Sequence, residues 1–318
     1  MRVAPPNPGT AVRLGLGCAQ LGNLYRAMSD ETATAIVDAA WAAGIRYYDT
    51  APHYGLGLSE RRLGVALRDR PRDEYFLSTK VGRLLVENPA HAGERDTEGF
   101  DVPATLVRRR DYSRDGVLRS LESSMDRLGV DRIDIAFVHD PEDHVEEALS
   151  GAVPALIELR DQGVLRGVGL GMNFDRVLAG FVRRSDVDTV MIAGRYTLLE
   201  QPALDELLPL CEERDVRVMA AGVFNSGILA NPTPGTTYNY EEAPPALVER
   251  ARRIAEVCAR FDVDLPTAAI ALPALHPAVE AVVVGASSVR QVESNTARAA
   301  AEVPPELWTA LRTEGLLR

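Results

Sequence analysis

Short β-rich runs alternate with longer amphipathic stretches along almost the whole 318-residue chain. Eight runs have the composition of buried strands: residues 12–17, 47–49, 76–80, 133–138, 167–171, 189–192, 216–221 and 281–284. Helical patterns separate them at 30–42, 60–67, 113–128, 153–161, 174–182, 204–214, 246–261 and 267–275, and further helices begin at 289 and 304. Because strands joined by helical crossovers run parallel, this alternation predicts an α/β chain built on a parallel sheet.

Eight such units over about 250 residues plus insertions are typical of a closed (β/α)8 TIM barrel. No break in composition divides the chain, so we expect a single domain over residues 1–318. A doubly wound nucleotide-binding sheet is the alternative, but the first strand leads into Gly15-Leu16-Gly17-Cys18-Ala19-Gln20, which lacks the third glycine of that fingerprint. Residues 82–112 and 225–245 show no clear period, and we expect them to be long loops that shape a pocket.

The charge of the chain excludes several classes of partner. Asp and Glu number 46 against 35 Lys and Arg, a formal net charge of −11, which favours neither nucleic acid nor an anionic membrane. No apolar run reaches the roughly 20 residues of a membrane span. Residues 1–6 lack the apolar core of an export signal, so we expect a cytoplasmic protein. Cys18, Cys211 and Cys258 form no disulfide or zinc pattern, and we expect them to be small buried hydrophobic residues.

Polar residues end three consecutive predicted strands. Asp49 ends the second, Lys80 the third and His139 the fourth, while Tyr54 lies on the loop after Asp49. The active site of a barrel of this type lies at the carboxyl ends of its strands, so we expect these four side chains at one rim. Lys80 is also the only lysine of the chain. Codon bias and chance explain that scarcity as well, but a compact ammonium with a movable pKa suits a rim position.

These four residue types can move a proton on or off an oxygen atom. A free tyrosine has a pKa near 10, and a cation within about 4–6 Å favours its phenolate form. Lys80 can supply that cation, Asp49 can keep Lys80 charged, and His139 can donate a hydrogen bond to a substrate oxygen. Hydride transfer to a nicotinamide is the natural partner of such a proton transfer at a carbonyl or alcohol.

The same residues carry a family resemblance. Asp49-Thr50-Ala51-Pro52-His53-Tyr54-Gly55 with Ser59-Glu60, then Ser78-Thr79-Lys80, then Val138-His139 resemble the aldo-keto reductase superfamily in order and spacing. The resemblance implies a barrel without a metal, a nicotinamide cofactor, and a catalytic tetrad of Asp49, Tyr54, Lys80 and His139 with Tyr54 as general acid and base. It also implies a small carbonyl or sugar substrate and a monomer or small homo-oligomer.

Other segments resemble a sugar-oxidising branch of this family, which includes aldose 1-dehydrogenases, L-galactose dehydrogenases and pyridoxal 4-dehydrogenases. They are residues 15–18, 51–60, 193–201 and 222–227. The resemblance implies oxidation of an aldose at C1 to the lactone. An NADPH-dependent aldehyde or ketone reductase and a pyridoxal 4-dehydrogenase are the alternatives within the family, and a cofactor-binding regulatory subunit is the non-enzymatic alternative.

The resemblance further implies where a dinucleotide binds. The expected contacts are Asn173 after the fifth strand, Phe224, Asn225 and Gly227 after the seventh, and Gly285, Ser287, Ser288, Gln291 and Asn295 after the eighth. NADP-preferring members place Lys or Arg early in the last segment, whereas this chain has Ser287 and Ser288 with Arg290 as the nearest cation. We therefore expect NAD, or use of both cofactors, with a slight preference for NAD. Tyr25 and His53 are the expected substrate wall.

Two other classes of barrel enzyme fit poorly. A glycosidase needs two carboxylates that flank the cleaved bond, but the seventh strand ends in Ala220-Ala221-Gly222 and supplies none. A metal-dependent hydrolase needs paired histidines near the first strand, and none are there. Asp140 and His144, just after the fourth strand, are interpreted as loop or helix-start residues.

Overall fold

Eight parallel strands close into a barrel in the computed structural model, which describes residues 12–91, 93–239 and 241–318. Residues 1–6, from which we expect no export signal, lie outside the described part of the chain. Around the barrel the order is β1-β12-β9-β8-β7-β6-β3-β2. The strands are β1 (Leu14–Gly17), β2 (Tyr47–Asp49), β3 (Phe76–Val81), β6 (Ile135–His139), β7 (Gly167–Met172), β8 (Thr189–Ala193), β9 (Arg217–Ala221) and β12 (Val279–Gly285). The predicted TIM barrel is confirmed.

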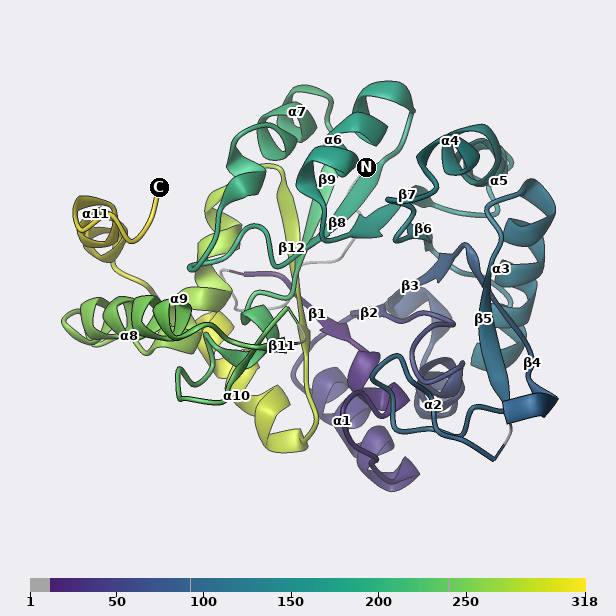
Figure 1. The fold of residues 1–318 in the computed structure, drawn as a ribbon, viewed down its shortest axis with the longest axis horizontal. Coiled ribbons are helices and arrows are strands. Elements are labelled where there is room, and N and C mark those ends of the chain that lie inside the picture. Colours follow the sequence, from purple (N-terminus) through teal and green to yellow (C-terminus); the bar gives the residue numbers. More distant parts are fainter. Residues whose placement is uncertain (1–11, 92, 240) are drawn as a thin grey trace.

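Helices surround the barrel on its outside (Figure 1). They are α1 (Asp30–Ala42), α2 (Leu58–Leu67), α3 (Arg114–Leu128), α4 (Val145–Glu147), α5 (Val153–Asp161), α6 (Asp175–Arg184), α7 (Leu207–Glu213), α8 (Pro245–Ala259), α9 (Leu265–Ala271), α10 (Val289–Ala300) and α11 (Pro305–Thr313). Ser29 and Ser113 cap α1 and α3, since each side chain accepts a hydrogen bond from a backbone N–H of the first turn. No helix among the described residues is both long and apolar enough to cross a membrane.

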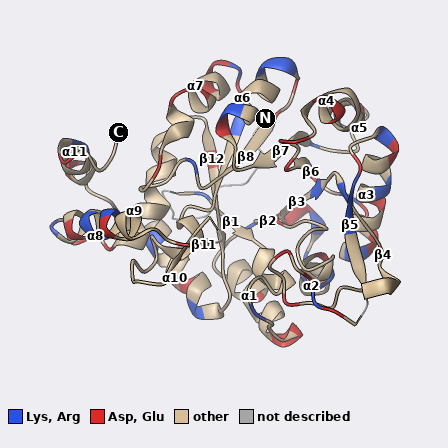
Figure 2. Ribbon diagram, in the orientation of Figure 1, with Lys and Arg blue, Asp and Glu red and all other residues tan. Residues whose placement is uncertain are grey.

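The barrel interior is a packed core. Tyr47, Ile135, Phe137, Met191, Met219, Ala281 and Val283 fill it. Larger apolar clusters fill the space between the strands and the surrounding helices, and the free thiols of Cys18, Cys211 and Cys258 are buried in them as expected. Charged residues of both signs lie along the outer helices, for example α3 and α8, whereas most of the barrel is uncharged (Figure 2). The polar groups at the strand ends therefore stand on a rigid apolar scaffold.

Residues 82–112 are not the structureless loop that we expected. They contain an antiparallel hairpin of β4 (Arg83–Glu87) and β5 (Leu106–Arg110), and β4 packs against α3. The hairpin begins at Gly82, whose φ of 98° lies in the left-handed region, and a Cβ there would lie 2.3 Å from the Tyr112 ring. Residues 225–245 are closer to the expectation, because their only described strands are the two-residue β10 (Thr237–Tyr238) and β11 (Glu241–Glu242).

Candidate active site

Lys80 contacts two of the other three predicted side chains, Asp49 and Tyr54. Its Nζ donates to Asp49 Oδ2 at 2.6 Å, to the Thr50 carbonyl at 3.0 Å and to Tyr54 Oη at 3.1 Å. An ammonium has three N–H donors, and these three bonds use all of them. Lys80 and Asp49 are each only 2% exposed. The ends of β2 and β3 thus place a carboxylate, a cation and a phenol in direct contact.

A chain of hydrogen bonds from Tyr47 and Ser78 holds the carboxylate of Asp49 in place. Its Oδ1 accepts a hydrogen bond from Ser78 Oγ at 2.7 Å, and Ser78 in turn contacts the Tyr47 hydroxyl at 3.0 Å. Burial works to lower the pKa of Lys80, but Asp49 and Tyr54 outweigh it and raise that pKa above its ordinary value. Lys80 is therefore a permanent cation at neutral pH, aimed at the oxygen of Tyr54.

His139 ends β6 and is 6% exposed. Its ring stands edge-on to that of Tyr54, with centroids 5.9 Å apart and an interplanar angle of 89°. Burial lowers the pKa of His139 well below its ordinary value, and the cations of Arg83 and Lys80 lower it further. The imidazole beside Tyr54 is therefore neutral at physiological pH, and can donate one hydrogen bond without carrying charge.

The loop that carries Tyr54 is locked by close backbone contacts. Gly55 has a φ of 62°, and a Cβ on it would lie 2.2 Å from the Gly22 carbonyl oxygen, so the two loops touch only because both residues are glycines. Ser59 Oγ donates to the Cys18 carbonyl at 2.7 Å and contacts Thr50 Oγ1 at 2.8 Å. The motif residue Ser59 therefore positions the loop and does not face the candidate site.

Glu60 of the same motif also has a structural role, because it links neighbouring elements of the fold. Its buried carboxylate accepts hydrogen bonds from Thr79 Oγ1 at 2.7 Å and from Arg127 Nε at 2.6 Å. These bonds tie α2 to β3 and α3. Because Thr79 precedes Lys80, the contact also fixes the strand that delivers the cation.

Sequence reasoning missed a second charged pair beside His139. Arg83 Nη2 donates to Asp140 Oδ2 at 2.5 Å, and Asp140, interpreted from the sequence as a loop residue, turns its carboxylate to within 3.5 Å of His139 Nε2. Arg83 Nη1 also lies 3.2 Å from His53 Nδ1. His144, by contrast, stands at the start of α4 as expected. The position of Arg83 depends on the hairpin, which no periodicity in the sequence revealed.

His53 and the hairpin segment form one wall beside Tyr54. The ring of Phe100 lies edge-on to His53 at 5.1 Å and 6.0 Å from Tyr54. Burial and then the cations of Arg83 and Arg108 lower the pKa of His53 to about 2. Residues 82–112 thus contribute directly to the surroundings of Tyr54, and His53 contributes a neutral imidazole.

A cavity of about 720 Å³ opens at the carboxyl ends of β1, β9 and β12, the same end of the barrel as the four residues above. Seven of the predicted cofactor contacts line it: Phe224, Gly227, Gly285, Ser287, Ser288, Gln291 and Asn295. Tyr25, expected at the substrate, lines this cavity and is 56% exposed. The predicted cofactor segment and the β1–α1 loop therefore face one another.

Two predicted cofactor contacts lie outside this lining. Asn173 follows β7 and is half-buried, and Asn225 is buried with its Nδ2 donating to the Gly194 carbonyl at 3.2 Å. Their roles as cofactor contacts stay predictions.

The donors around the cavity fit a dinucleotide. Gln20 lines the cavity, and its buried Oε1 has no hydrogen-bond partner in the described chain. A Cβ at Gly285 would lie 2.3 Å from that same oxygen, so only glycine leaves room for it. Ser288 caps α10, a helix N-terminus that favours an anion. Sequence reasoning missed Gln20, although its place just after the first strand was a usable signal.

Arginines from separate segments also line the cavity, and two of them were missed. Arg26 Nη2 donates to Ser287 Oγ at 3.2 Å, and Arg298 joins the Arg290 that the sequence had indicated. The sequence has no cation at position 287, but the fold brings Arg26 of the β1–α1 loop into contact with Ser287.

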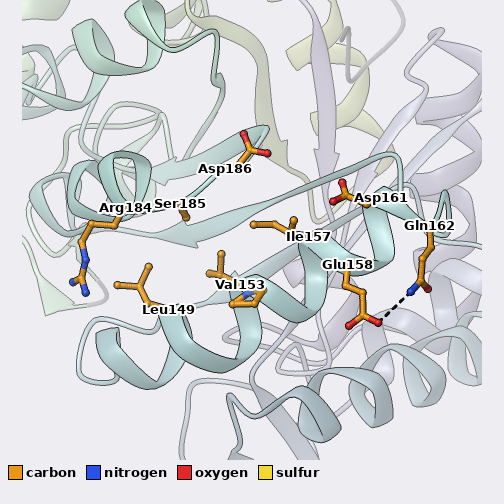
Figure 3. A pocket seen from close by; sticks show the side chains of 10 residues that line it. Leu149, Val153, Ile157, Glu158, Asp161, Gln162, Arg184, Ser185 and Asp186 are labelled. Carbon is orange, nitrogen blue, oxygen red and sulfur yellow. Dashed lines mark hydrogen bonds between the residues drawn. The ribbon is translucent and has the colours of Figure 1, made fainter.

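A second hollow, of about 680 Å³, lies on the outer surface (Figure 3). Its lining comes from α5 and from the end of α6, with Val153, Ile157, Arg184 and Asp186 among the labelled side chains. None of the predicted site residues borders it. The chemistry of the four rim residues is thus separate from this groove.

Comparison with known proteins gives a consistent result. Residues 13–313 match the profile of the Aldo/keto reductase family. A D-threo-aldose 1-dehydrogenase from a Pseudomonas species is 48% identical over 96% of this chain and 94% of that protein. A pyridoxal 4-dehydrogenase from Microbacterium luteolum is 39% identical over 97% and 95% of the two chains, and an L-galactose dehydrogenase from Arabidopsis thaliana is 30% identical over 89% and 83%.

Solved structures share the barrel. The holo form of an aldo-keto reductase from Bacillus halodurans is 25% identical with a TM-score of 0.75, covering 100% of this chain and 97% of that one. A glycerol dehydrogenase from Gluconobacter oxydans, 20% identical with a TM-score of 0.72, covers 98% and 94% and shows likeness of fold. An aldo-keto reductase from Klebsiella pneumoniae solved with NADPH has a TM-score of 0.68 at 22% identity over 96% and 92%.

Proposed function

This chain belongs to the aldo/keto reductase family and is an oxidoreductase, and we propose that it oxidises a cyclic aldose at C1 to the lactone. The observation that carries the proposal is the contact of Lys80 Nζ with Tyr54 Oη at 3.1 Å, beside a neutral His139. The 48% identity with a D-threo-aldose 1-dehydrogenase supports an aldose as substrate.

The proposed proton chemistry follows from the contacts of Tyr54. The bound nicotinamide supplies the hydride acceptor. Lys80 stabilises the phenolate of Tyr54 through its ammonium, and Asp49 keeps that ammonium in place. Tyr54 Oη takes the proton from the anomeric hydroxyl as that carbon is oxidised, and His139 donates a hydrogen bond to the same substrate oxygen. In the reverse direction Tyr54 returns the proton to a carbonyl oxygen.

The charges around Tyr54 favour an uncharged substrate. Charged side chains of this region are already paired, Lys80 with Asp49, Arg83 with Asp140, and Arg108 with Asp96 and Glu98, and the imidazoles of His53 and His139 are neutral. A free sugar needs groups that bind hydroxyls but no unpaired charge, and a site whose charges are already paired meets this requirement. A phosphorylated sugar or a sugar acid would have to displace an existing ion pair.

The proposed cofactor is NAD(P), with NAD preferred by less than about tenfold, which is 1.4 kcal/mol. Ser287 and Ser288 occupy the places where NADP-preferring relatives are expected to carry a cation, which favours NAD. Arg26 contacts Ser287 from across the cavity and can pair with the 2′-phosphate of NADP, which reduces the preference for NAD over NADP.

Replacement of one hydroxyl tests the proposed reaction. Initial rates of NADH or NADPH formation at 340 nm should be highest with L-fucose, L-galactose or D-arabinose, and Tyr54→Phe should lower kcat about 10²- to 10⁴-fold, because the proton acceptor is lost. Cofactor affinity should stay unchanged. Tyr75→Phe is the matched control, since Tyr75 precedes β3 at the opposite end of the barrel.

Two results would contradict the proposal. Turnover that survives in Tyr54→Phe would remove Tyr54 from the chemistry. Activity confined to aldehyde reduction with NADPH would leave the family assignment intact and refute sugar oxidation. Pyridoxal belongs in the same substrate series, because a pyridoxal 4-dehydrogenase is 39% identical to this chain.

A further inference from the structure

The ion pair of Arg83 and Asp140 borders His139 and has no part in the reaction proposed above. Arg83 Nη2 donates to Asp140 Oδ2 at 2.5 Å, and the same oxygen lies 3.5 Å from His139 Nε2. The Arg83 side chain is 10% exposed and that of Asp140 28%. His139 Nδ1, at the other side of the ring, is buried and has no hydrogen-bond partner in the described chain. The only charged acceptor within 4 Å of the imidazole among the described residues is therefore Asp140.

The direction of the Asp140 carboxylate is built into the backbone. Asp140 has a φ of 44°, in the left-handed region, and its N–H donates to the Gly171 carbonyl at 3.0 Å. The Tyr112 hydroxyl contacts the carbonyls of both His139 and Asp140 at 3.0 Å. These contacts determine which way the chain leaves β6, and they turn the carboxylate back toward the ring that precedes it.

We propose that the Arg83–Asp140 ion pair positions His139, holding its imidazole in one orientation with the proton on Nε2 and keeping it uncharged. The carboxylate of Asp140, 3.5 Å from Nε2 and not hydrogen-bonded to it, favours the proton on Nε2 and leaves that N–H available to the substrate oxygen, and Arg83 neutralises the carboxylate so that it does not draw a second proton onto the ring. A proton on the buried Nδ1 would be a donor without an acceptor, which disfavours the other tautomer. The proposal rests on the proposed function only for the role of His139 in turnover.

The charges that face His139 agree with a neutral ring. Lys80 on β3, Arg83 on β4 and Arg110 on β5 are cations, His53 is uncharged, and the ring of Tyr54 is perpendicular to that of His139. Asp140 is the carboxylate that opposes them at close range. Removal of Arg83 would leave two cations, Lys80 and Arg110, against the carboxylate of Asp140, and would shift the protonation equilibrium of His139 toward the imidazolium.

Nitrogen NMR of 15N-histidine-labelled protein tests the tautomer directly, without substrate or turnover. The chain has five histidines, and the His139 signals are identified by their loss in His139→Asn. In the native protein we expect a proton on Nε2 and no titration of His139 from about pH 5 to about pH 8. In Arg83→Gln we expect His139 to titrate within that interval, and in Asp140→Asn we expect a mixture of tautomers that still does not titrate.

Kinetics supply the second readout. Arg83→Gln should lower kcat about tenfold on the acid side of the new ionisation and recover above it, with KM for the sugar little changed. Asp140→Asn should lower kcat about tenfold at every pH, and Arg83→Lys should behave as the native protein because it keeps the charge. The matched control is Arg109→Gln, which removes a cation from the exposed side of the same hairpin.

The proposal fails if His139 has the same tautomer and the same lack of titration in Arg83→Gln and Asp140→Asn as in Arg109→Gln. Thermal unfolding of each variant separates loss of structure from loss of position, and Asp140→Asn alone tests the ion pair if Arg83→Gln does not fold. Should no sugar be oxidised by any form, the proposed function falls while the NMR result still decides the positioning role.

Discussion

Lys80 is a buried cation whose three donors are all satisfied, and each partner does separate work. Asp49 supplies the opposite charge, the Thr50 carbonyl fixes the direction of the ammonium, and Tyr54 Oη receives the remaining donor. Burial of an ammonium costs several kcal/mol in the absence of such partners. The contact with Asp49 therefore allows Lys80 to keep its positive charge beside the Tyr54 hydroxyl although the lysine is almost fully buried.

Because Lys80 is the only lysine, selective labelling isolates it. 15N-lysine protein should give one side-chain ammonium signal, which we expect to remain protonated beyond pH 10.5, the ordinary pKa of the group. A pKa raised in the folded chain stabilises the fold below that value, and this stabilisation is lost as the pH rises through the folded pKa. In Asp49→Asn burial is no longer outweighed, so the signal should titrate at lower pH.

Asp30→Asn is the control for this measurement, since Asp30 pairs with Arg62 on the surface at the start of α1. An ammonium signal that titrates at the same pH in native protein and in Asp49→Asn would show that Asp49 does not hold the proton on Lys80.

At the scale of elements, the cavity is assembled from segments that lie far apart in the sequence. Arg26 comes from the loop between β1 and α1, Phe224 from the segment after β9, and Ser287 from the turn between β12 and α10. Closure of the barrel makes β1 and β12 neighbours, with Gly17 paired to Gly285, and so brings the first loop beside the last. The contact of Arg26 with Ser287 follows from that pairing.

Arg26→Gln should distinguish the two cofactors. Its guanidinium is the cation that touches Ser287, so its loss should weaken NADPH binding about tenfold and change NADH binding little, as measured by quenching of protein fluorescence. Arg253→Gln is the matched control on the exposed side of α8, outside the cavity. Equal losses for both cofactors, or none for NADPH, would contradict a role for Arg26 at the 2′ position.

The strand ends could be predicted from the sequence, whereas the hairpin could not. Asp49, Lys80 and His139 each follow an apolar run, and the geometry of a parallel barrel alone requires such positions to share a rim. The β5 run of Leu106 to Arg110 ends in three arginines, so neither alternation nor an apolar run marks it as a strand. Without the hairpin there was no reason to place Arg83 beside Asp140.

Contacts between distant loops were likewise beyond sequence reasoning. Arg26 and Ser287 are 261 positions apart, and only the barrel closure makes them partners. Tyr25, expected at the substrate, lines the same cavity for the same reason. The five residues that the family resemblance predicted at and after the end of β12 all line one cavity, but the resemblance did not reveal the arginines supplied by other elements.

For the molecule as a whole, the rim of the barrel is a place where polar groups are buried at a cost in stability. His53 and His139 are both held neutral by burial and by nearby arginines, and their rings lie 5.5 Å apart. The apolar barrel core and the layers under the helices contribute most of the free energy of folding. The neutral histidines make that free energy depend on pH.

Acidification should therefore destabilise the fold before most carboxylates are protonated. The pKa of His53 is about 2 in the folded chain and about 6.5 in the unfolded chain, so the unfolded chain binds more protons at every pH between these values. The lowered pKa of His139 acts in the same direction. Between about pH 6.5 and about pH 5, the free energy of unfolding should fall by up to about 1.4 kcal/mol per pH unit for each of these histidines.

Urea unfolding at a series of pH values measures this slope. His53→Asn removes one of the histidines whose pKa burial lowers, so its slope should be smaller by roughly one proton, and His91→Asn, at an exposed position after β4, is the matched control. Identical slopes in the native protein and His53→Asn would mean that His53 is protonated equally in the folded and unfolded chains. In that case burial and the Arg83 and Arg108 guanidinium groups would not be lowering the pKa of His53, and the neutral wall beside Tyr54, from which an uncharged substrate is inferred, would have to be abandoned.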